Sequence, residues 1–199
     1  MTQDEVLFQK HLSDLAGTAD RRGFAVFTDF MNLNELNIFH ASVQKFSYVT
    51  TKTFGGYEHA ERQMAAFIPD ALLFQWSFPI ACLRIRPLNK KFAEKLTHRD
   101  CLGAVLNLGI DRSKTGDILT GEDCCWMFCT ESMADFICQE LTRVRHTSVM
   151  CERCSPDEIQ AGIHTEEVTG TVSSVRLDSV LAVACKASRS SLVSAIEEG

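Results

Sequence analysis

The order of the secondary-structure elements expected between residues 76 and 155 constrains the fold more than any other feature of this sequence. Alternating and β-branched residues predict four strands, and apolar residues at helical spacing predict two helices. The strands are expected over 78–86, 116–119, 124–129 and 147–152, and the helices over 97–108 and 132–144. This β-α-β-β-α-β order is that of the ferredoxin-like fold. We therefore predict an α+β chain with a ferredoxin-like domain in its middle.

The first helix of this domain has clear signals at both ends. Thr97 followed by Asp100 resembles a capping box, and Gly109 stands where a left-handed residue follows a helix. A short polar turn with Arg112 and Lys114 comes next. The sequence predicts that these two cations are exposed, which suits contact with phosphate groups.

The plan is shared by the RRM, which binds RNA across the open face of its sheet. Trp126 and Phe128 alternate on one face of the 124–129 strand, where an RRM carries the aromatic rings that stack on bases. The RRM consensus for that strand is absent. The two rings would also suit a buried core, and the sequence leaves both interpretations open.

Cations are concentrated in one part of an acidic chain. The 199 residues carry a net charge of −6, but the window 84–99 holds six cations and one anion. This contrast fits binding to one particular shape of nucleic acid, with a solvated charged face as the alternative. Alternation puts Arg84 and Arg86 on the sheet face away from the helices. Arg143 and Arg145 are expected at the end of the second helix, where they either extend this patch or only favour the helix dipole.

The two flanking regions are expected to be smaller. Residues 1–75 predict an α/β region, in which 57–69 forms either a strand or a short helix. Its other expected elements are a helix over 3–16 that ends at Gly17, a strand over 24–30, a helix capped by Asn32 with Glu35, and a strand over 47–54. Residues 156–175 predict a linker with a short strand at 168–172. Residues 176–199 predict two short helices, the second capped by Ser188, whose small apolar seam is a poor core.

Residue usage bounds the class of protein. No apolar run approaches the roughly 18 to 20 residues that span a membrane, and charges throughout the first 30 residues argue against a signal peptide, so we expect a cytoplasmic protein. Of the nine cysteines, Cys151 and Cys154 have metal-ligand spacing. They lack a second pair at a suitable distance, so we expect packing rather than a metal site. We expect no cofactor.

Catalytic motifs are absent. The letters HRD at 98–100 occur in protein kinases, but no Gly-rich loop, V-A-I-K lysine or D-F-G accompanies them. His98 and Asp100 have no further acid–base group at a diagnostic spacing. The sequence therefore predicts a protein that is not an enzyme and has no catalytic residue.

Five stretches in order resemble the YlmH family of bacterial and plastid RNA-binding proteins. They are FTDFMNLNELNIF at 27–39, GGYEHAERQMAAFIPD at 55–70, LTHRDCLGAVLNLGIDRSKTGDI at 96–118, LTRVRHT at 141–147 and RLDSVLAVACKASRSSLVSAIEEG at 176–199. The resemblance implies an N-terminal α/β region, an RRM-like middle domain and a C-terminal module of the ribosomal-protein-S-four type. It also implies binding to ribosomal RNA and tRNA on the large ribosomal subunit, with peptidyl-tRNA, in the rescue of stalled translation. An association with cell division is implied for some members.

The terminal module resembles its family in Arg176 and Asp178 and in Ser188, Arg189 and Ser190. The family pattern continues into a β-hairpin beyond Gly199, so we expect a truncated module. The expected RNA contacts are Arg84, Arg86, Arg99, Arg112, Lys114, Arg143, Arg145, Arg176, Ser188 and Arg189. We expect a monomer that binds RNA. A protein-interaction adaptor of cell division and an RNA-modifying enzyme are the alternatives.

Overall fold

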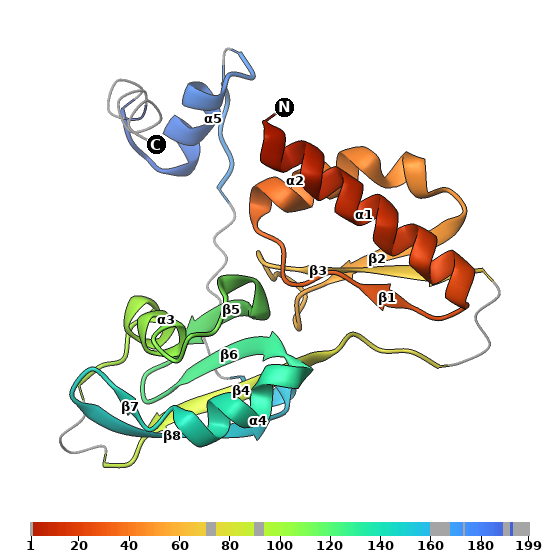
Figure 1. Cartoon of the computed structure of the whole chain (residues 1–199). Coiled ribbons are helices and arrows are strands. Elements are labelled where there is room, and N and C mark those ends of the chain that lie inside the picture. The colour runs from red at the N-terminus through yellow and green to blue at the C-terminus, as the bar shows by residue number, and fades with distance from the viewer. Residues whose placement is uncertain are drawn as a thin grey trace. The chain divides into compact units, whose positions relative to one another are not determined.

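The computed structural model describes residues 2–70, 75–89, 94–159, 168–172, 174–188 and 192. The chain divides into two compact units, Met1–Ala161 and Gly162–Gly199. Figure 1 shows the elements of each unit along the chain. Within the described ranges, no helix combines the length and the apolar character that a membrane crossing requires.

The first part of the larger unit packs two helices on one face of a small sheet. The helices are α1 (Gln3–Arg22) and α2 (Leu33–Ser42), followed by a 3-10 turn over Val43–Phe46. The strands β1 (Val26–Phe27), β2 (Val49–Phe54) and β3 (Met64–Pro69) form an antiparallel sheet in the order β1-β3-β2. The segment 57–69, which the sequence left open, therefore contributes a strand and not a helix.

The end of α1 was predicted wrongly. The helix continues through Gly17 and ends at Gly23, whose φ of 70° is left-handed. A glycine inside a helix costs about 1 kcal/mol relative to alanine. Burial of Leu12, Ala16 and Ala19 against the sheet outweighs that cost, because all three are fully buried. The predicted cap of α2 is confirmed, since Asn32 and Glu35 form a complete capping box.

The second part has the predicted ferredoxin-like topology with one extra strand. Its elements are β4 (Ile80–Pro87), α3 (His98–Leu106), a 3-10 turn over Arg112–Lys114, β5 (Thr115–Thr120), β6 (Cys125–Thr130), α4 (Glu131–Glu140), β7 (Arg143–Val144), β8 (Thr147–Cys154) and a 3-10 turn over Pro156–Glu158. The sheet is antiparallel in the order β5-β6-β4-β8-β7. Thr97 and Asp100 form the predicted capping box of α3, and Gly109 has a φ of 81°.

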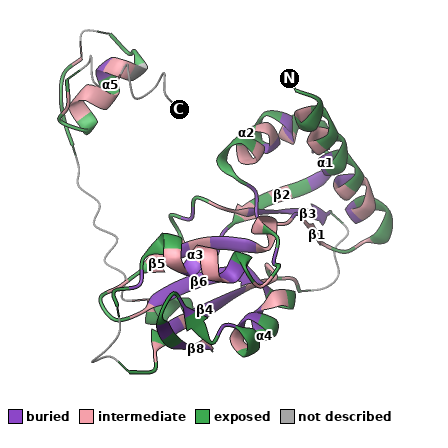
Figure 2. Ribbon diagram, turned by 60° about the vertical axis from the view of Figure 1, so that its left-hand side comes forward, coloured by how far each residue is buried: buried purple, intermediate pink, exposed green. Residues whose placement is uncertain are grey.

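Both faces of this sheet are packed. One face carries a core to which both α3 and α4 contribute: Ala81, Leu83, Ile85, Cys101, Val105, Cys125, Met127, Cys129, Ala134 and Ile137. The opposite face carries a second cluster, in which Cys82, Trp126 and Phe128 of this sheet pack against Phe30 and Met64 of the first part of the unit. In Figure 2, β6 accordingly has the colour of buried residues.

The end of α4 differs from the prediction. The helix ends at Glu140, and its N-cap is Thr130 without a side-chain hydrogen bond, so Ser132 is not the cap. Val144 is fully buried and pairs with Thr147 in a β-hairpin. Because Arg143 lies on a strand, the helix-dipole explanation for the cations at this position does not apply.

The smaller unit is described in part. Its helix α5 spans Leu177–Ala184 and begins after Arg176. Residues 168–172 do not form the strand that the sequence predicted. The amide of Leu192 donates to the carbonyl of Ser188, as at the start of a helix. The predicted contact residue Arg189 lies outside the described residues.

Candidate nucleic-acid interface

The sheet face that an RRM uses for RNA is not available in this chain. Phe128 is fully buried and its ring stacks on Tyr57, with centroids 5.3 Å apart and planes 18° apart. Trp126 is 4% exposed in the same cluster. Of the two interpretations that the sequence allowed, the structure supports the buried core.

A clasp of hydrogen bonds holds the loop 55–63 against β5. Asp117 Oδ2 accepts from the Tyr57 hydroxyl at 2.9 Å and from the Glu61 amide at 2.7 Å, and Oδ1 accepts from the Arg62 amide at 3.1 Å. The Arg62 guanidinium in turn donates to the carbonyls of Thr115, Phe30 and Arg112. No local sequence pattern indicates this clasp, although both of its segments lie in stretches that carry the family resemblance.

The basic turn after α3 is part of this clasp region and is not a pair of exposed cations. The Arg112 guanidinium donates to the carbonyls of Thr115 at 2.9 Å and Gly116 at 3.0 Å. The Lys114 ammonium is 2.7 Å from Asp29 Oδ1. Both side chains are half-buried. Their donors and charges are thus largely used within the protein.

Two other predicted cations are paired with carboxylates. Arg84 lies 2.7 Å from Glu152 Oε1 and 3.3 Å from Glu158 Oε2, and Arg86 lies 3.2 Å from the same Glu152 oxygen. The hydrogen bond to Glu152 raises the pKa of Arg84 further. Glu152 lies on β8 directly opposite Arg84 of β4, and Glu158 lies in the 3-10 turn after β8.

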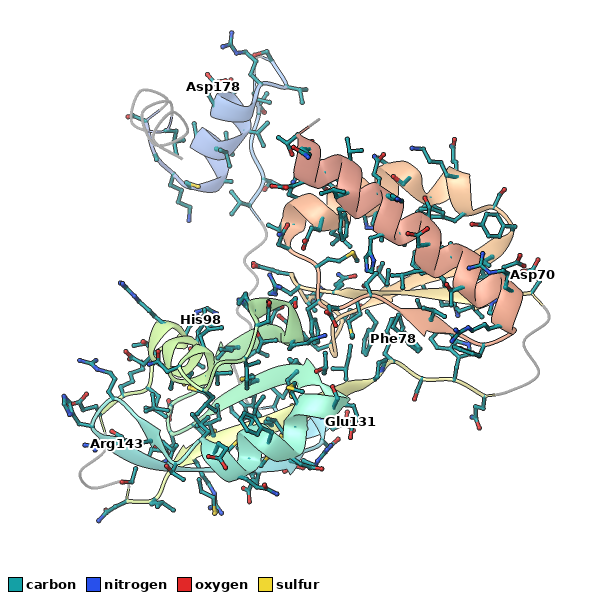
Figure 3. The ribbon with its side chains drawn as sticks, viewed as in Figure 1. Asp70, Phe78, His98, Glu131, Arg143 and Asp178 are labelled. Carbon is teal, nitrogen blue, oxygen red and sulfur yellow. The ribbon has the colours of Figure 1, made fainter. Side chains whose placement is uncertain are left out.

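Three further arginines gather around a groove between α3 and β7. The groove has a volume of about 590 Å³, and Arg99, Arg143 and Arg145 all line it. All three are exposed; the described part of the chain offers Arg99 and Arg143 no ion pair, and Arg145 reaches Glu94 and Asp100 only at 3.8 and 3.7 Å. Figure 3 labels Arg143 on β7 and His98 at the start of α3. The sequence predicted these arginines but not that they share one concave surface.

Small and polar residues line the groove beside the arginines, together with two carboxylates, Asp100 and Glu140. Gly103 of α3 and Asn107, the C-cap of that helix, line it, and a Cβ added at Gly103 would meet nothing within 4 Å outside the adjoining helix backbone. Asp100 serves mainly as the cap of α3: the Thr97 hydroxyl donates to it at 2.6 Å and holds the pKa of that carboxyl below its usual range. Its nearness to Arg145 is a secondary cause of the same shift.

The hairpin tip places Arg145 in an unfavourable backbone conformation. Arg145 and His146 form the two-residue turn between β7 and β8, and the φ of Arg145 is 52°. Asparagine and glycine populate this region far more readily than arginine. Strained residues of this kind cluster at binding sites, which fits a functional role for the Arg145 side chain.

We predict that Arg145→Asn separates stability from RNA binding. Asparagine tolerates the left-handed conformation without the chain entropy of glycine, so the free energy of unfolding should stay equal or rise by up to about 1 kcal/mol. Urea unfolding measures this change. Affinity for RNA should fall at the same time, because the guanidinium is lost; a parallel fall in both quantities would contradict the prediction.

The described residues of the smaller unit add two exposed cations, of which Arg176 is a predicted RNA contact and Lys186 is not. The Arg176 side chain is 73% exposed, and its Nε lies 3.3 Å from Asp178 Oδ1. Arg176 is also the residue that precedes α5. Its role in RNA contact stays a prediction, as does that of Ser188.

The thiols of the larger unit are buried or half-buried, as packing requires. Cys151 faces the α3 and α4 side of the sheet, whereas Cys154 approaches Cys82 on the other side with their sulfurs 3.4 Å apart. Two strand residues three positions apart point to opposite faces, so this pair cannot share one metal ion. Burial raises the pKa of the Cys151 thiol, which keeps it protonated. Among the described residues, no three metal-ligand side chains come together.

Comparison with known proteins finds a matching domain family and a relative that covers most of the chain. A family model described as "Putative RNA-binding domain in YlmH" matches residues 75–158. The protein called "Ribosome-associated protein quality control protein P2" from Bacillus subtilis (strain 168) is 30% identical over 176 residues, which cover 86% of this chain and 66% of that protein. The chain thus spans just under two thirds of that relative's length.

A solved structure shares the fold. The structure called "Cell division protein ylmH from Streptococcus pneumoniae" superposes with a TM-score of 0.61 at 22% identity, over 77% of this chain and 93% of that one. The matched domain and the 30% identical relative show that the chain belongs to the YlmH family.

Proposed function

We propose that this protein is a non-catalytic RNA-binding protein that associates with the ribosome. The finer proposal is contact with the large subunit and peptidyl-tRNA during the rescue of stalled translation, in the cytoplasm. The observation that carries it is the groove in which Arg99, Arg143 and Arg145 converge. The name of the Bacillus subtilis relative and the description of the matched domain add support.

The groove fits a phosphate backbone better than the other cations do. A guanidinium binds phosphate oxygens in bidentate fashion, and three of them around one concave surface would follow successive phosphates of a structured RNA. Arg84, Arg86, Arg112 and Lys114 would first have to give up carboxylate or carbonyl partners. We therefore assign the primary contact to the groove, with Arg176 as a second contact from the smaller unit.

Co-sedimentation with ribosomal subunits over a salt series tests this proposal. The variant with alanine at 99, 143 and 145 should bind the large subunit at least about tenfold more weakly, since hydrogen bonds to charged groups are each worth about 1.5–3 kcal/mol. Each lost phosphate contact should also reduce the slope of log affinity against log salt by about 0.7–0.9. Unchanged affinity and slope would refute the groove as the contact surface.

A charge-matched control comes from α1. Alanine at Lys10, Arg21 and Arg22 removes the same three charges from exposed positions, and this variant should bind like the unaltered chain. Replacing the paired Arg84 and Arg86 should have a smaller effect than replacing the groove arginines. If no form of the chain binds ribosomes, the ribosomal proposal fails and a protein-adaptor function becomes the better hypothesis.

A further inference from the structure

An aromatic cluster lies on the face of the N-terminal sheet away from α1 and α2. Phe27 and Lys52 both pair with Ala66 of β3, so they point to the same face of that sheet. Phe78 of the segment that leads into β4 contacts Phe27 and Phe54, with ring centroids 5.7 and 5.6 Å apart. Trp76 joins the cluster at 5.5 Å from Phe78 and 6.1 Å from Phe27.

These rings are not part of a closed core. Phe54 is 40% exposed, and Phe27, Trp76 and Phe78 are each half-buried. They stand beside a pocket of about 560 Å³, which lies in the range typical of ligand sites. Phe54, Trp76 and Phe78 line one wall, and the fully buried Phe128 reaches the pocket from β6. Figure 3 labels Phe78 in the segment before β4 and Glu131 at the start of α4.

One cation lies beside a ring of the pocket wall, and one ion pair lines the pocket itself. The Lys52 ammonium lies 5.7 Å from the centre of the Trp76 ring, and within the described ranges it has no carboxylate partner. Glu131 and Arg153 line the pocket and pair at 2.7 Å, whereas Lys52 is not among the residues that line it. A guanidinium has five donors and a carboxylate about four acceptor sites. After the two side chains have paired, both therefore still have hydrogen-bonding groups for a ligand that carries donors and acceptors.

We propose that this pocket binds one unpaired base of a single-stranded RNA segment. The base stacks against the aromatic wall of Phe54 and Trp76, and Lys52 contacts a neighbouring phosphate. Partly exposed aromatic rings beside a cation that has no carboxylate partner among the described residues suit a base and its phosphate better than an apolar peptide side chain, which needs no cation. The inference rests on the RNA-binding function proposed above and names the kind of RNA that a second surface takes.

The position of this pocket compensates for the covered sheet face. In an RRM the aromatic residues of the third strand stack on bases, but here Trp126 and Phe128 are buried beneath the loop 55–63 and its surroundings. The partly exposed rings of this chain lie instead on the neighbouring sheet and the segment 75–79. The chain thereby keeps a stacking surface at a place that the RRM pattern does not indicate.

Tryptophan fluorescence provides a direct measurement. The chain has two tryptophans, and Trp126→Phe leaves Trp76 as the single reporter. Titration with an eight-nucleotide single-stranded RNA should quench Trp76. An abasic ribose-phosphate chain of the same length and a duplex of the same sequence should not. Equal quenching by the abasic chain would overturn the proposal, because phosphates alone would then explain binding.

Substitutions in the otherwise unaltered chain give a second measurement, by anisotropy of the labelled RNA. Phe54→Ser removes an exposed ring and should weaken binding about 5- to 100-fold, and Lys52→Gln should reduce its salt dependence. The control is Tyr48→Ser, an aromatic of similar exposure in the same sheet region that does not line the pocket. Equal affinity of the Phe54→Ser and Tyr48→Ser variants would overturn the inference.

The outcomes distinguish this inference from the proposed function. If the groove variant loses ribosome binding while the Phe54→Ser variant binds RNA normally, the proposed function is supported and the base-binding role of the pocket is refuted. If no form of the chain binds ribosomes but single-stranded RNA still quenches Trp76, the base-binding role of the pocket is supported and the ribosomal function is refuted. Quenching by an apolar peptide and not by RNA would overturn the pocket as an RNA site.

Discussion

Gly56→Ala should destabilise the larger unit by about 4 kcal/mol. Two independent effects add at this position. The φ of Gly56 is 104°, a conformation that alanine rarely adopts. A Cβ there would lie 2.2 Å from Phe128 Cδ1 and 2.5 Å from Cε1. Phe128 cannot move aside easily, because it is fully buried and stacked on Tyr57. Urea unfolding followed by circular dichroism measures the loss.

A second glycine supplies the control for this experiment. Gly103 lies inside α3 with no atom within 4 Å of an added Cβ. Gly103→Ala should therefore be neutral or stabilise the chain by up to about 1 kcal/mol, because alanine favours the helix. A loss below about 1 kcal/mol for Gly56→Ala would mean that the loop 55–63 is not held tightly against the sheet, contrary to the packing described above.

The parts of the fold that follow from neighbouring residues were predictable. Asn32 and Glu35 cap α2, and Thr97 and Asp100 cap α3, because each pair satisfies amide groups within three residues of itself. Alternation along β4 correctly assigned Leu83 to the face that α3 and α4 cover. From such local patterns the order of strands and helices in the ferredoxin-like domain could be deduced.

The partners of the cations could not be predicted, because they come from distant parts of the chain. Lys114 pairs with Asp29, which is 85 residues away, and Arg84 pairs with Glu152 at 68 residues. An isolated basic turn and a paired one have the same local sequence. The same limit applies to Trp126, whose burial depends on packing against Phe30 and Met64 of the first part of the unit.

The predictions of where helices end were wrong for a related reason. Gly17 is a sound stop signal in isolation, but burial of the stripe that includes Leu12 and Ala19 keeps α1 helical beyond it. Val144 fits the spacing of a longer α4, but in the structure it lies beyond the end of that helix and pairs with Thr147 in the hairpin. Arg143 and Arg145 of that hairpin line the groove. The shape of the groove therefore could not be predicted from the periodicity of the sequence.

Asp117→Ala should cost about 3 kcal/mol of stability, the second largest effect that we expect in this chain. The substitution leaves the Tyr57 hydroxyl and the amides of Glu61 and Arg62 without their acceptor. An unsatisfied buried group costs about 1–3 kcal/mol, and the partial exposure of this loop reduces the sum because water replaces some of the lost bonds. Thermal and urea unfolding both measure the loss.

The ionisation of Tyr57 gives this prediction a second, independent readout. Burial, and then the hydrogen bond to Asp117, raise the pKa of Tyr57 well above its usual value near 10. Since the pKa in the folded chain exceeds that of the unfolded chain, Tyr57 stabilises the fold below pH 10 and this contribution is lost as the pH rises through the folded pKa. In the Asp117→Ala variant the pKa of Tyr57 should fall towards 10 while the effect of burial remains.

Two comparison variants show whether the clasp itself is responsible. Asp117→Asn keeps one acceptor oxygen but turns a donor towards the chain, so it should lie between Asp117→Ala and the unaltered protein. Asp135→Ala removes a carboxylate that is 76% exposed and pairs with Arg153 at the surface, which should cost less than about 1 kcal/mol. Equal losses for Asp117→Ala and Asp135→Ala would contradict the clasp. A large loss confined to Asp117, together with the lowered pKa of Tyr57, would mean that this carboxylate holds the loop 55–63 over the sheet face that an RRM leaves open.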